Sequence, residues 1–386
     1  MPFIKDRMKI VSVIGARPQI IKAAALSRAI RKVYSDEINE VIVHTGQHYD
    51  ENMSQVFFDE LGIPKPDFNL NVGSATHGIQ TARMIEGIEE VLLDEKPDYL
   101  VVYGDTNSTL AAAVAASKIH VPIVHIEAGL RSFNKSMPEE INRIMCDHAS
   151  TLLFSPTKTG FDNLIKEGFK KDAQKPFTAD NPAIFHCGDV MLDNSLHFKK
   201  IALEKSCVLK DNNLEKGNFI LGTIHRDNNT DQADRLNAIL YSLLKISENE
   251  NIVLPLHPRT SKLLDRNLSS ELLQKLQNTN KIKLIPPVSF LDMIALESNC
   301  KMVITDSGGV QKESYFFKKP CIILRPETEW KEIVEVGAAV IADASEEKII
   351  GAYNKFNNKD LEEYPSIFGD GKAAEFICKT MLENIK

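Results

Sequence analysis

The chain of 386 residues lacks the features that mark secreted, membrane-spanning and zinc-binding proteins. Its six cysteines form no C-x-x-C pair, so they indicate reduced thiols rather than a structural zinc site. No apolar stretch reaches the roughly 18 residues of a membrane span, and the short apolar run near the N-terminus does not fit a signal peptide. We therefore expect a cytoplasmic protein that does not enter the membrane.

Positive charge and several common nucleotide and hydrolase motifs are also in short supply. The formal net charge is −7, which argues against nucleic acid or an anionic membrane surface as the main partner. The chain has no G-x-G-x-x-G fingerprint, no P-loop and no G-x-S-x-G nucleophile elbow. Its His, Asp and Glu residues show no clean metal-ligand spacing. Dinucleotide, ATP, serine-hydrolase and metal chemistry are therefore poorly supported.

Short runs rich in Val and Ile recur along the chain, each followed by a helix-length segment. Because these runs do not alternate, they suit parallel strands buried on both faces, with helices as crossovers. Predicted strands lie at 9–15, 40–46, 98–105 and 121–129, then after a polar insert (170–183) at 219–225, 251–257, 282–287, 301–309 and 320–326, and predicted helices include 20–33, 53–62, 108–119 and 138–150. We predict two doubly wound parallel α/β domains, residues 1–186 and 187–371, and a final amphipathic helix.

Polar residues gather where the predicted strands end. They lie at 15–17, 45–48, 104–106, 127–131, 225–226, 257–259 and 306–309. In open parallel sheets, ligands bind beyond the carboxyl ends of the strands. Two such domains facing each other would place these residues around one central cleft.

In the second domain, "VITDSGGVQKES" runs from a strand through Ser307, Gly308 and Gly309 into a helix expected from about Val310. Unpaired N–H groups and the positive end of the helix dipole would bind an anion such as a diphosphate. The alternative is a tight turn in which Ser307 is a plain N-cap. Glu313 would accept ribose hydroxyls or simply complement the helix N-terminus.

Basic residues and a histidine stand at three further strand ends. Arg17 precedes Pro18 at a helix start, with Lys22 about one turn later, so both are candidates for gripping phosphate, or else are solvated surface charges. His225, beside Arg226, suits a substrate phosphate or a proton transfer. His125, inside an apolar strand, is expected to be a satisfied core residue.

Carboxylates are concentrated between residues 103 and 143. Asp105 ends one predicted strand, Glu127 ends the next, and Glu139, Glu140 and Arg143 open the following helix. Converging carboxylates raise one another's pKa toward neutrality, which suits acid–base chemistry. The alternative is structural: Asp105 caps the helix at Thr106, and Glu139 pairs with Arg143 at i, i+4.

Together these motifs resemble the non-hydrolysing UDP-N-acetylglucosamine 2-epimerases from about residue 8 to 340. They are "GARPQIIK", "TGQHYD", "YGDTNSTLAAAVAASK", "HIEAGLRSFNKSMPEEINR", "HCGDVMLDN", "TIHRDNN", "LPLHPRT" and "TDSGGVQKES". The resemblance implies a fold like that of B-type glycosyltransferases, with helix 372–386 returning to the first domain. It also implies a UDP-sugar substrate, a homodimer, no added cofactor and a role in surface polysaccharide biosynthesis.

The resemblance also implies roles for particular residues. The residues expected to hold UDP are Arg17, His225, Ser307, Gly308, Gly309 and Glu313, and those expected around the sugar are Lys22, Asp105, Glu127, Glu139, Arg143 and His225. Asp105, Glu127 and Glu139 would be the acid–base groups. The implied chemistry eliminates UDP to give a glycal, with loss of the proton at C2, and re-adds UDP after C2 is protonated from the opposite face. Domain closure would exclude water meanwhile.

The chain departs from the common family pattern after Arg325, where "RPETEWKEIVEVG" places Trp330 in a stretch that otherwise contains arginine. An arginine associated with a second, activating UDP-sugar site is also absent from the segments near residues 45 and 70. Similar variants occur in the subgroup that epimerises UDP-2,3-diacetamido-2,3-dideoxy-glucuronate. That sugar is therefore an alternative substrate, and a B-type glycosyltransferase, a hydrolysing epimerase and a non-catalytic UDP-sugar sensor are alternative functions.

Overall fold

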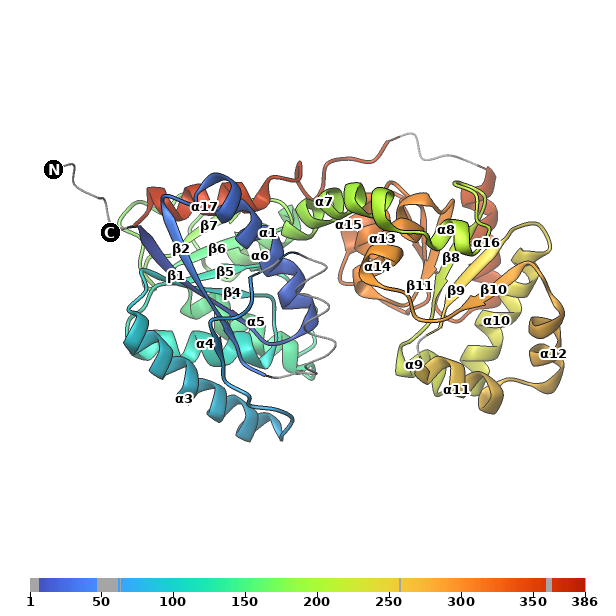
Figure 1. Cartoon of the computed structure of the whole chain (residues 1–386), viewed down its shortest axis with the longest axis horizontal. Helices are drawn as coiled ribbons and strands as arrows, with labels where there is room; N and C mark the ends of the chain where they lie inside the picture. Colours follow the sequence, from blue (N-terminus) through green and yellow to red (C-terminus); the bar gives the residue numbers. More distant parts are fainter. Residues whose placement is uncertain (1–6, 47–61, 63, 257, 359–362, 386) are drawn as a thin grey trace. The chain divides into compact units, whose positions relative to one another are not determined.

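The computed structural model describes residues 7–46, 62, 64–256, 258–358 and 363–385 (Figure 1). Two compact units make up the chain, Met1–Asn194 with Ser366–Lys386, and Ser195–Pro365. Helix α7 (Val190–Lys205) runs across the boundary between them. The helix predicted at 53–62 lies outside the described residues, apart from Gly62, and so does His257.

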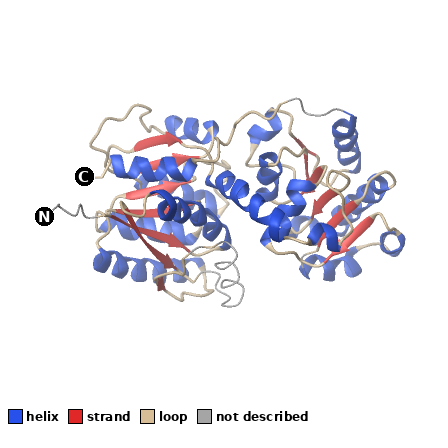
Figure 2. Ribbon diagram, turned by 45° about the horizontal axis from the view of Figure 1, so that its top comes forward, coloured by secondary structure: helices blue, strands red, loops and turns tan. Residues whose placement is uncertain are grey.

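The first unit is built on a parallel sheet of seven strands in the order β3-β2-β1-β4-β5-β6-β7. Its strands are β1 (Met8–Ile14), β2 (Ile38–His44), β3 (Phe68–Asn69), β4 (Tyr99–Tyr103), β5 (Ile123–Ile126), β6 (Leu152–Ser155) and β7 (Ala183–His186). Its helices are α1 (Arg17–Val33), α3 (His77–Glu95), α4 (Asn107–Lys118), α5 (Pro138–Ala149), α6 (Lys158–Lys166) and α17 (Ala373–Glu383). Figure 2 shows the strands enclosed between helices in each unit.

Helices cover both faces of this sheet, which explains why its strands read as continuous apolar runs. Helices α1 and α17 pack against each other on the face opposite α3 and α4 (Figure 1). Alternate strand residues such as Val11, Val13, Leu100 and Val102 are fully buried in the cluster with α3 and α4. The end of α17 is tied to the sheet by the Tyr99 hydroxyl, which donates to the Asn384 carbonyl at 2.7 Å.

The second unit repeats this plan with six parallel strands in the order β10-β9-β8-β11-β12-β13. Its strands are β8 (Ile220–Thr223), β9 (Ile252–Pro255), β10 (Ile282–Ile285), β11 (Met302–Thr305), β12 (Cys321–Ile323) and β13 (Ala339–Ile341). Its helices are α8 (Val208–Asp211), α9 (Asp227–Thr230), α10 (Ala233–Ser247), α11 (Pro258–Asn267), α12 (Ser270–Asn278), α13 (Phe290–Asn299), α14 (Gly308–Phe316), α15 (Lys331–Glu335) and α16 (Glu346–Asn358). The prediction of two parallel-sheet α/β domains is confirmed.

In each sheet the strand order reverses at one place, between β1 and β4 and between β8 and β11. The loops after two such strands diverge to opposite faces and leave a crevice for ligands at the carboxyl edge. Arg17 and Asp105 follow β1 and β4, and His225 and Ser307 follow β8 and β11. These four predicted residues therefore stand at the reversal points of the two sheets.

A buried glutamine fixes the loops on either side of the first reversal point. The Gln19 side chain, 1% exposed, accepts the backbone N–H groups of Gly15 and Ala16 at 2.9 and 3.1 Å. Its amide donates to the Tyr103 carbonyl at 3.0 Å and to the Thr109 hydroxyl at 2.9 Å. One side chain thus joins the loop after β1 to the loop after β4.

A buried ion pair fixes the next two loops in the same way. His125, on β5, lies 2.7 Å through Nδ1 from an Asp147 oxygen and 2.8 Å through Nε2 from the Gly104 carbonyl. Both ring nitrogens face acceptors, so both carry protons and the imidazole is charged. Asp147 also contacts Arg131 at 2.7 Å and accepts the Gly129 N–H at 3.1 Å. The sequence prediction that His125 is a satisfied core residue is confirmed.

The charge on His125 makes stability depend on pH. Burial alone would lower the pKa of His125, but Cys146 and Asp147 raise it well above its ordinary value. In the unfolded chain a histidine titrates near pH ~6.5. Below that pH both states hold the proton, and the stabilisation is complete. As the pH rises further, only the folded state keeps the proton, so the free energy of unfolding falls.

We predict that His125→Gln lowers the free energy of unfolding at pH 6 by about 3–5 kcal/mol, because Asp147 loses part of its buried counter-charge. The variant should also lose the decline in stability between pH 6.5 and 9. Urea unfolding at several pH values measures both effects. His148→Gln is the matched control, since the His148 side chain is 51% exposed. An equal pH dependence in wild type and His125→Gln would contradict a charged His125.

Candidate active site

Lysine and glutamate from separate elements meet at the carboxyl edge of the first sheet. Lys22 lies on the second turn of α1, and Glu127 directly follows β5. The Lys22 Nζ lies 2.7 Å from Glu127 Oε1, and each side chain is 11% exposed. Glu127 has a φ of 76°, a left-handed conformation that side chains other than glycine rarely adopt. Such strain persists where surrounding contacts impose it, and it is typical of functional positions.

Asp105 stands beside this pair, just after β4. Its carboxylate forms an ion pair with Arg143 of α5, and the Asn142 side chain donates to its backbone carbonyl at 2.9 Å. Burial raises the pKa of Asp105, and the charges of Glu127 and Glu139 add to this. Lys22 and Arg143 oppose the rise without cancelling it. A carboxyl with a raised pKa next to an ion-paired carboxylate is an arrangement that supports proton transfer.

Both structural alternatives for these acids prove wrong. The N-cap of α4 is Thr106, whose hydroxyl accepts the Thr109 N–H at 3.4 Å, so Asp105 does not cap this helix. Arg143 pairs with Glu140 at 2.9 Å, at i, i+3, and not with Glu139. Glu139 is exposed on the first turn of α5. Capping and local pairing therefore do not account for Asp105 and Glu139.

Glu140 was placed at the start of its helix by the sequence analysis, but it was given no role there. It is 1% exposed and accepts the backbone N–H groups of Ser132 and Phe133, each at 2.9 Å. Burial opposes its charge, but these bonds and Arg143 lower its pKa. Glu140 thereby holds Arg143 against Asp105. Its spacing of three residues from Arg143 on a helix was the available signal.

The remaining predicted residue of the first unit is Arg17. It is the first residue of α1, its side chain is exposed, and Pro18 follows it in the first turn. The loops after β1, β4 and β5 and the first two turns of the helices that follow them carry all six predicted residues of this unit: Arg17, Lys22, Asp105, Glu127, Glu139 and Arg143.

In the second unit, α14 begins at Gly308, two residues earlier than predicted, so both glycines lie in its first turn. Ser307 is the N-cap, and its hydroxyl accepts the Val310 N–H at 3.5 Å. Neither glycine has a positive φ, and a Cβ atom on Gly309 would meet nothing closer than 3.9 Å. The backbone conformation therefore does not require Gly309. Its missing side chain leaves the N–H groups of the first turn accessible, as an anion site needs.

A buried aspartate ties this turn to the loop that carries His225. Asp306 is fully buried, and it accepts the backbone N–H groups of His225 at 3.1 Å and Arg226 at 3.0 Å. The Asn229 side chain also donates to it at 3.0 Å. These bonds place His225, whose side chain is exposed, beside the start of α14. Sequence reading noted Asp306 at the strand end but gave it no role.

Glu313 lies on the second turn of α14, and its charge acts on a second carboxyl, that of Glu297 on α13. Glu297 is fully buried. Burial and the charge of Glu313 raise the pKa of Glu297 well above its usual range. The pair therefore favours its negative charge on Glu313, whose carboxylate oxygens can accept hydroxyl groups.

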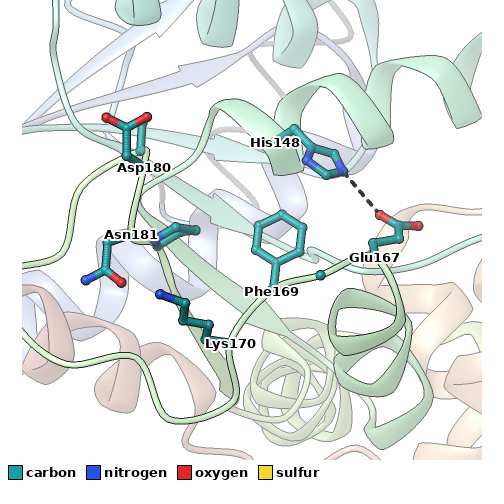
Figure 3. Close-up of a pocket in the computed structure, with 9 residues that line it drawn as sticks. His148, Glu167, Phe169, Lys170, Asp180 and Asn181 are labelled. Carbon is teal, nitrogen blue, oxygen red and sulfur yellow. Dashed lines mark ion pairs between the residues drawn. The ribbon is translucent and has the colours of Figure 1, made fainter.

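A separate hollow of the first unit lies at the polar insert (Figure 3). It has a volume of about 200 Å³ and is bounded by His148, Glu167, Phe169, Lys170, Asp180 and Asn181, among others. His148 faces Glu167 at 3.5 Å and packs beside Phe169, with ring centroids 5.0 Å apart. Ligand pockets measure about 300–1,000 Å³, so this hollow is small for a nucleotide sugar. None of the predicted site residues lines it.

Two further absences hold for the described part of the chain. No group of three or more His, Cys, Asp and Glu side chains there is arranged to hold a metal ion. Within the same residues, every helix is too short or too polar to cross a membrane.

Known proteins resemble this chain over nearly its whole length. A family model described as UDP-N-acetylglucosamine 2-epimerase matches residues 31–382. A UDP-N-acetylglucosamine 2-epimerase homolog of Methanococcus maripaludis is 47% identical, covering 97% of this chain and 99% of the relative. The UDP-2,3-diacetamido-2,3-dideoxy-D-glucuronate 2-epimerase of Pseudomonas aeruginosa is also 47% identical, covering 96% of this chain and all of the relative.

Solved structures agree. The crystal structure of Methanocaldococcus jannaschii UDP-GlcNAc 2-epimerase in complex with UDP-GlcNAc and UDP matches with a TM-score of 0.81 and 42% identity, covering 97% of this chain and 100% of that one. A Rickettsia africae glycosyltransferase shares the fold alone, with a TM-score of 0.60 and 14% identity over 99% of each chain. The resemblance drawn from the motifs is therefore confirmed, and the chain belongs to the UDP-N-acetylglucosamine 2-epimerase family.

Proposed function

We propose that this chain is a non-hydrolysing UDP-N-acetylglucosamine 2-epimerase that interconverts UDP-GlcNAc and UDP-ManNAc for surface polysaccharide biosynthesis. One observation carries the proposal beyond family membership. Asp105 and Glu127 converge with Lys22 and Arg143 at the carboxyl edge of the first sheet. A protein that only binds a UDP-sugar does not need such a set of proton-transfer groups.

In this proposal the second unit binds the nucleotide. The first turn of α14, with Ser307, Gly308 and Gly309, binds the diphosphate, and Glu313 accepts the ribose hydroxyls. His225 and Arg17 add donors to the nucleotide. This assignment is supported by the exposed Gly309, whose Cβ position would meet nothing closer than 3.9 Å, and by the raised pKa of Glu297, which favours the negative charge on Glu313.

The acids of the first unit act on the sugar. The proton at C2 has no carbonyl beside it, so it becomes acidic only as the C1–O bond breaks and UDP leaves with that electron pair. A carboxylate then takes the C2 proton, and the C–H electrons form the C1–C2 double bond of the glycal. Protonation of C2 from the opposite face and attack of UDP oxygen on C1 complete the epimerisation. No external oxidant or reductant is required.

Local charge suggests how the acids share these steps. Glu127 is ion-paired with Lys22 and serves as a proton acceptor. Asp105 has a raised pKa and serves as a group that both takes and returns a proton. Glu139, exposed on α5, is the third acid–base candidate. Lys22 and Arg143 stabilise the negative charge that shifts among these groups.

A second sugar nucleotide is the alternative substrate. The Pseudomonas aeruginosa relative, 47% identical, carries the name of an enzyme for UDP-2,3-diacetamido-2,3-dideoxy-D-glucuronate, and Trp330 departs from the common pattern. The elimination chemistry is the same for both sugars, because C3 and C6 take no part in it.

We also propose that the protein is a cytoplasmic homodimer. Exposed apolar side chains on α3 and α5, among them Leu93 and Met145 at 54% and 49%, support association through the first unit.

Glu127→Gln and Glu139→Gln should each lower hydrogen exchange at C2 by about 10²–10⁴-fold, because general acid–base catalysis contributes on that scale. UDP affinity should stay near wild type. The measurement is proton NMR of UDP-GlcNAc incubated alone with enzyme in D2O. Glu37→Gln is the matched control, an exposed glutamate just before β2, at the opposite end of the strands.

The same experiment separates the alternatives. A glycosyltransferase or a sensor would leave C2 unlabelled when no acceptor is present, and a hydrolysing enzyme would accumulate free N-acetylmannosamine. Either outcome with wild-type protein would overturn the proposed function.

Arg17→Ala should weaken UDP binding about 10- to 100-fold, as expected for a lost charge-assisted hydrogen bond. Isothermal titration with UDP measures this. An unchanged dissociation constant would remove Arg17 from the nucleotide site.

The two candidate sugars can be assayed side by side. We expect UDP-GlcNAc to give the larger kcat/KM for C2 exchange. A preference of tenfold or more for the diacetamido-glucuronate would reassign the substrate while leaving the reaction unchanged.

A further inference from the structure

The only tryptophan of the chain, Trp330, lies against the first turn of α14. It belongs to the loop between β12 and α15 and is 6% exposed. Its indole N–H donates to the Gly308 carbonyl at 3.0 Å. Gly308 is the first residue of α14, so this bond reaches the turn where the proposed function places the diphosphate.

A second contact joins the indole to the next turn of the same helix. The ammonium of Lys312 lies 4.2 Å from the centre of the Trp330 ring. Lys312 is 4% exposed and follows Gly308 by four residues, so both contacts fall on one side of α14. A buried cation over an indole face is a favourable pairing. Trp330 therefore spans the first two turns of α14.

The loop itself is fastened to α14 by a threonine. The Thr328 hydroxyl donates to the Gln311 side chain at 2.6 Å and accepts the Trp330 backbone N–H at 3.1 Å. Gln311 is fully buried. Trp330 is thus held at its backbone N–H by Thr328 and at its indole N–H by Gly308 of α14.

This turn needs support from outside itself. Two adjacent glycines give it no side chains to pack, and glycine loses the most conformational freedom when it is fixed. An anion site at a helix N-terminus works only when several N–H groups converge on one point. A neighbouring loop that fixes the Gly308 carbonyl also fixes the Gly309 N–H, because both belong to one rigid peptide unit.

We propose that Trp330 is a positioning residue for the diphosphate of the nucleotide, acting through Gly308 and Lys312 and not by touching the substrate. The inference rests on the proposed function, because it assumes that UDP binds at the first turn of α14. It assigns to Trp330 a role in nucleotide affinity and none in the proton-transfer steps.

Trp330→Phe tests the role, because phenylalanine keeps an aromatic face for Lys312 and removes only the N–H donor. UDP should bind about 3- to 10-fold more weakly by calorimetry, the scale of one lost hydrogen bond. KM should rise by a similar factor while kcat stays within about twofold, since the diphosphate is held alike in the ground and transition states. Tyr353→Phe is the matched control. This control removes the hydroxyl of another buried aromatic residue in the same unit. The Tyr353 hydroxyl donates to Glu250, which does not belong to α14.

Wild-type protein supplies an independent readout that does not depend on any variant folding. Since Trp330 is the sole indole, its fluorescence reports this position alone. UDP and inorganic pyrophosphate should each change the emission, whereas uridine should change it little. If UDP binds by calorimetry while the emission stays constant and Trp330→Phe binds UDP like wild type, the inference is overturned and the proposed function stands. If wild-type protein binds no UDP, the proposed function fails and takes this inference with it.

Discussion

A fully buried aspartate organises the working edge of each sheet. Asp147 in the first unit and Asp306 in the second are both 0% exposed. Each accepts hydrogen bonds from a loop that lies elsewhere in the sequence, which is Gly129 for Asp147 and His225 with Arg226 for Asp306. An ionised carboxylate without water is stable only when several donors surround it. The loops that supply those donors are therefore held in one arrangement, since each lost bond leaves charge unsatisfied.

The two aspartates reach this result differently. Asp147 is balanced by two cations, His125 and Arg131, within 2.7 Å, so the loops after β4 and β5 are joined through a charged network. Asp306 is held by neutral donors, two backbone N–H groups and one side-chain amide. Asp306 is therefore stabilised without a cationic partner among the hydrogen bonds that it accepts. The helix dipole and the exposed N–H groups then dominate the attraction of an anion.

The features that depend on local sequence pattern were predicted correctly. The strands could be predicted because strands buried on both faces consist of continuous apolar runs. The candidate site residues could be predicted because ligands of parallel sheets bind at the carboxyl ends of the strands. Side-chain partners that depend on long-range contacts were not predicted. Arg143 has acidic neighbours at i−3 and i−4, and only the fold decides that Glu140 turns inward to the Ser132 and Phe133 backbone. The bonds that Gln19 donates gave no signal, because Tyr103 and Thr109 lie 84 and 90 residues away. Glu297 gave none because Glu313, whose charge acts on it, lies on another helix.

Burial decides the electrostatics of the acidic cluster in the first unit. Lys22 and Arg143 face Glu127 and Asp105, and yet the pKa of Asp105 is raised, because burial and the charges of Glu127 and Glu139 outweigh the two cations. Asp105 therefore binds a proton more readily than a solvent-exposed aspartate does. In the reaction proposed above, this property suits a carboxyl that takes a proton in one step and returns it in another.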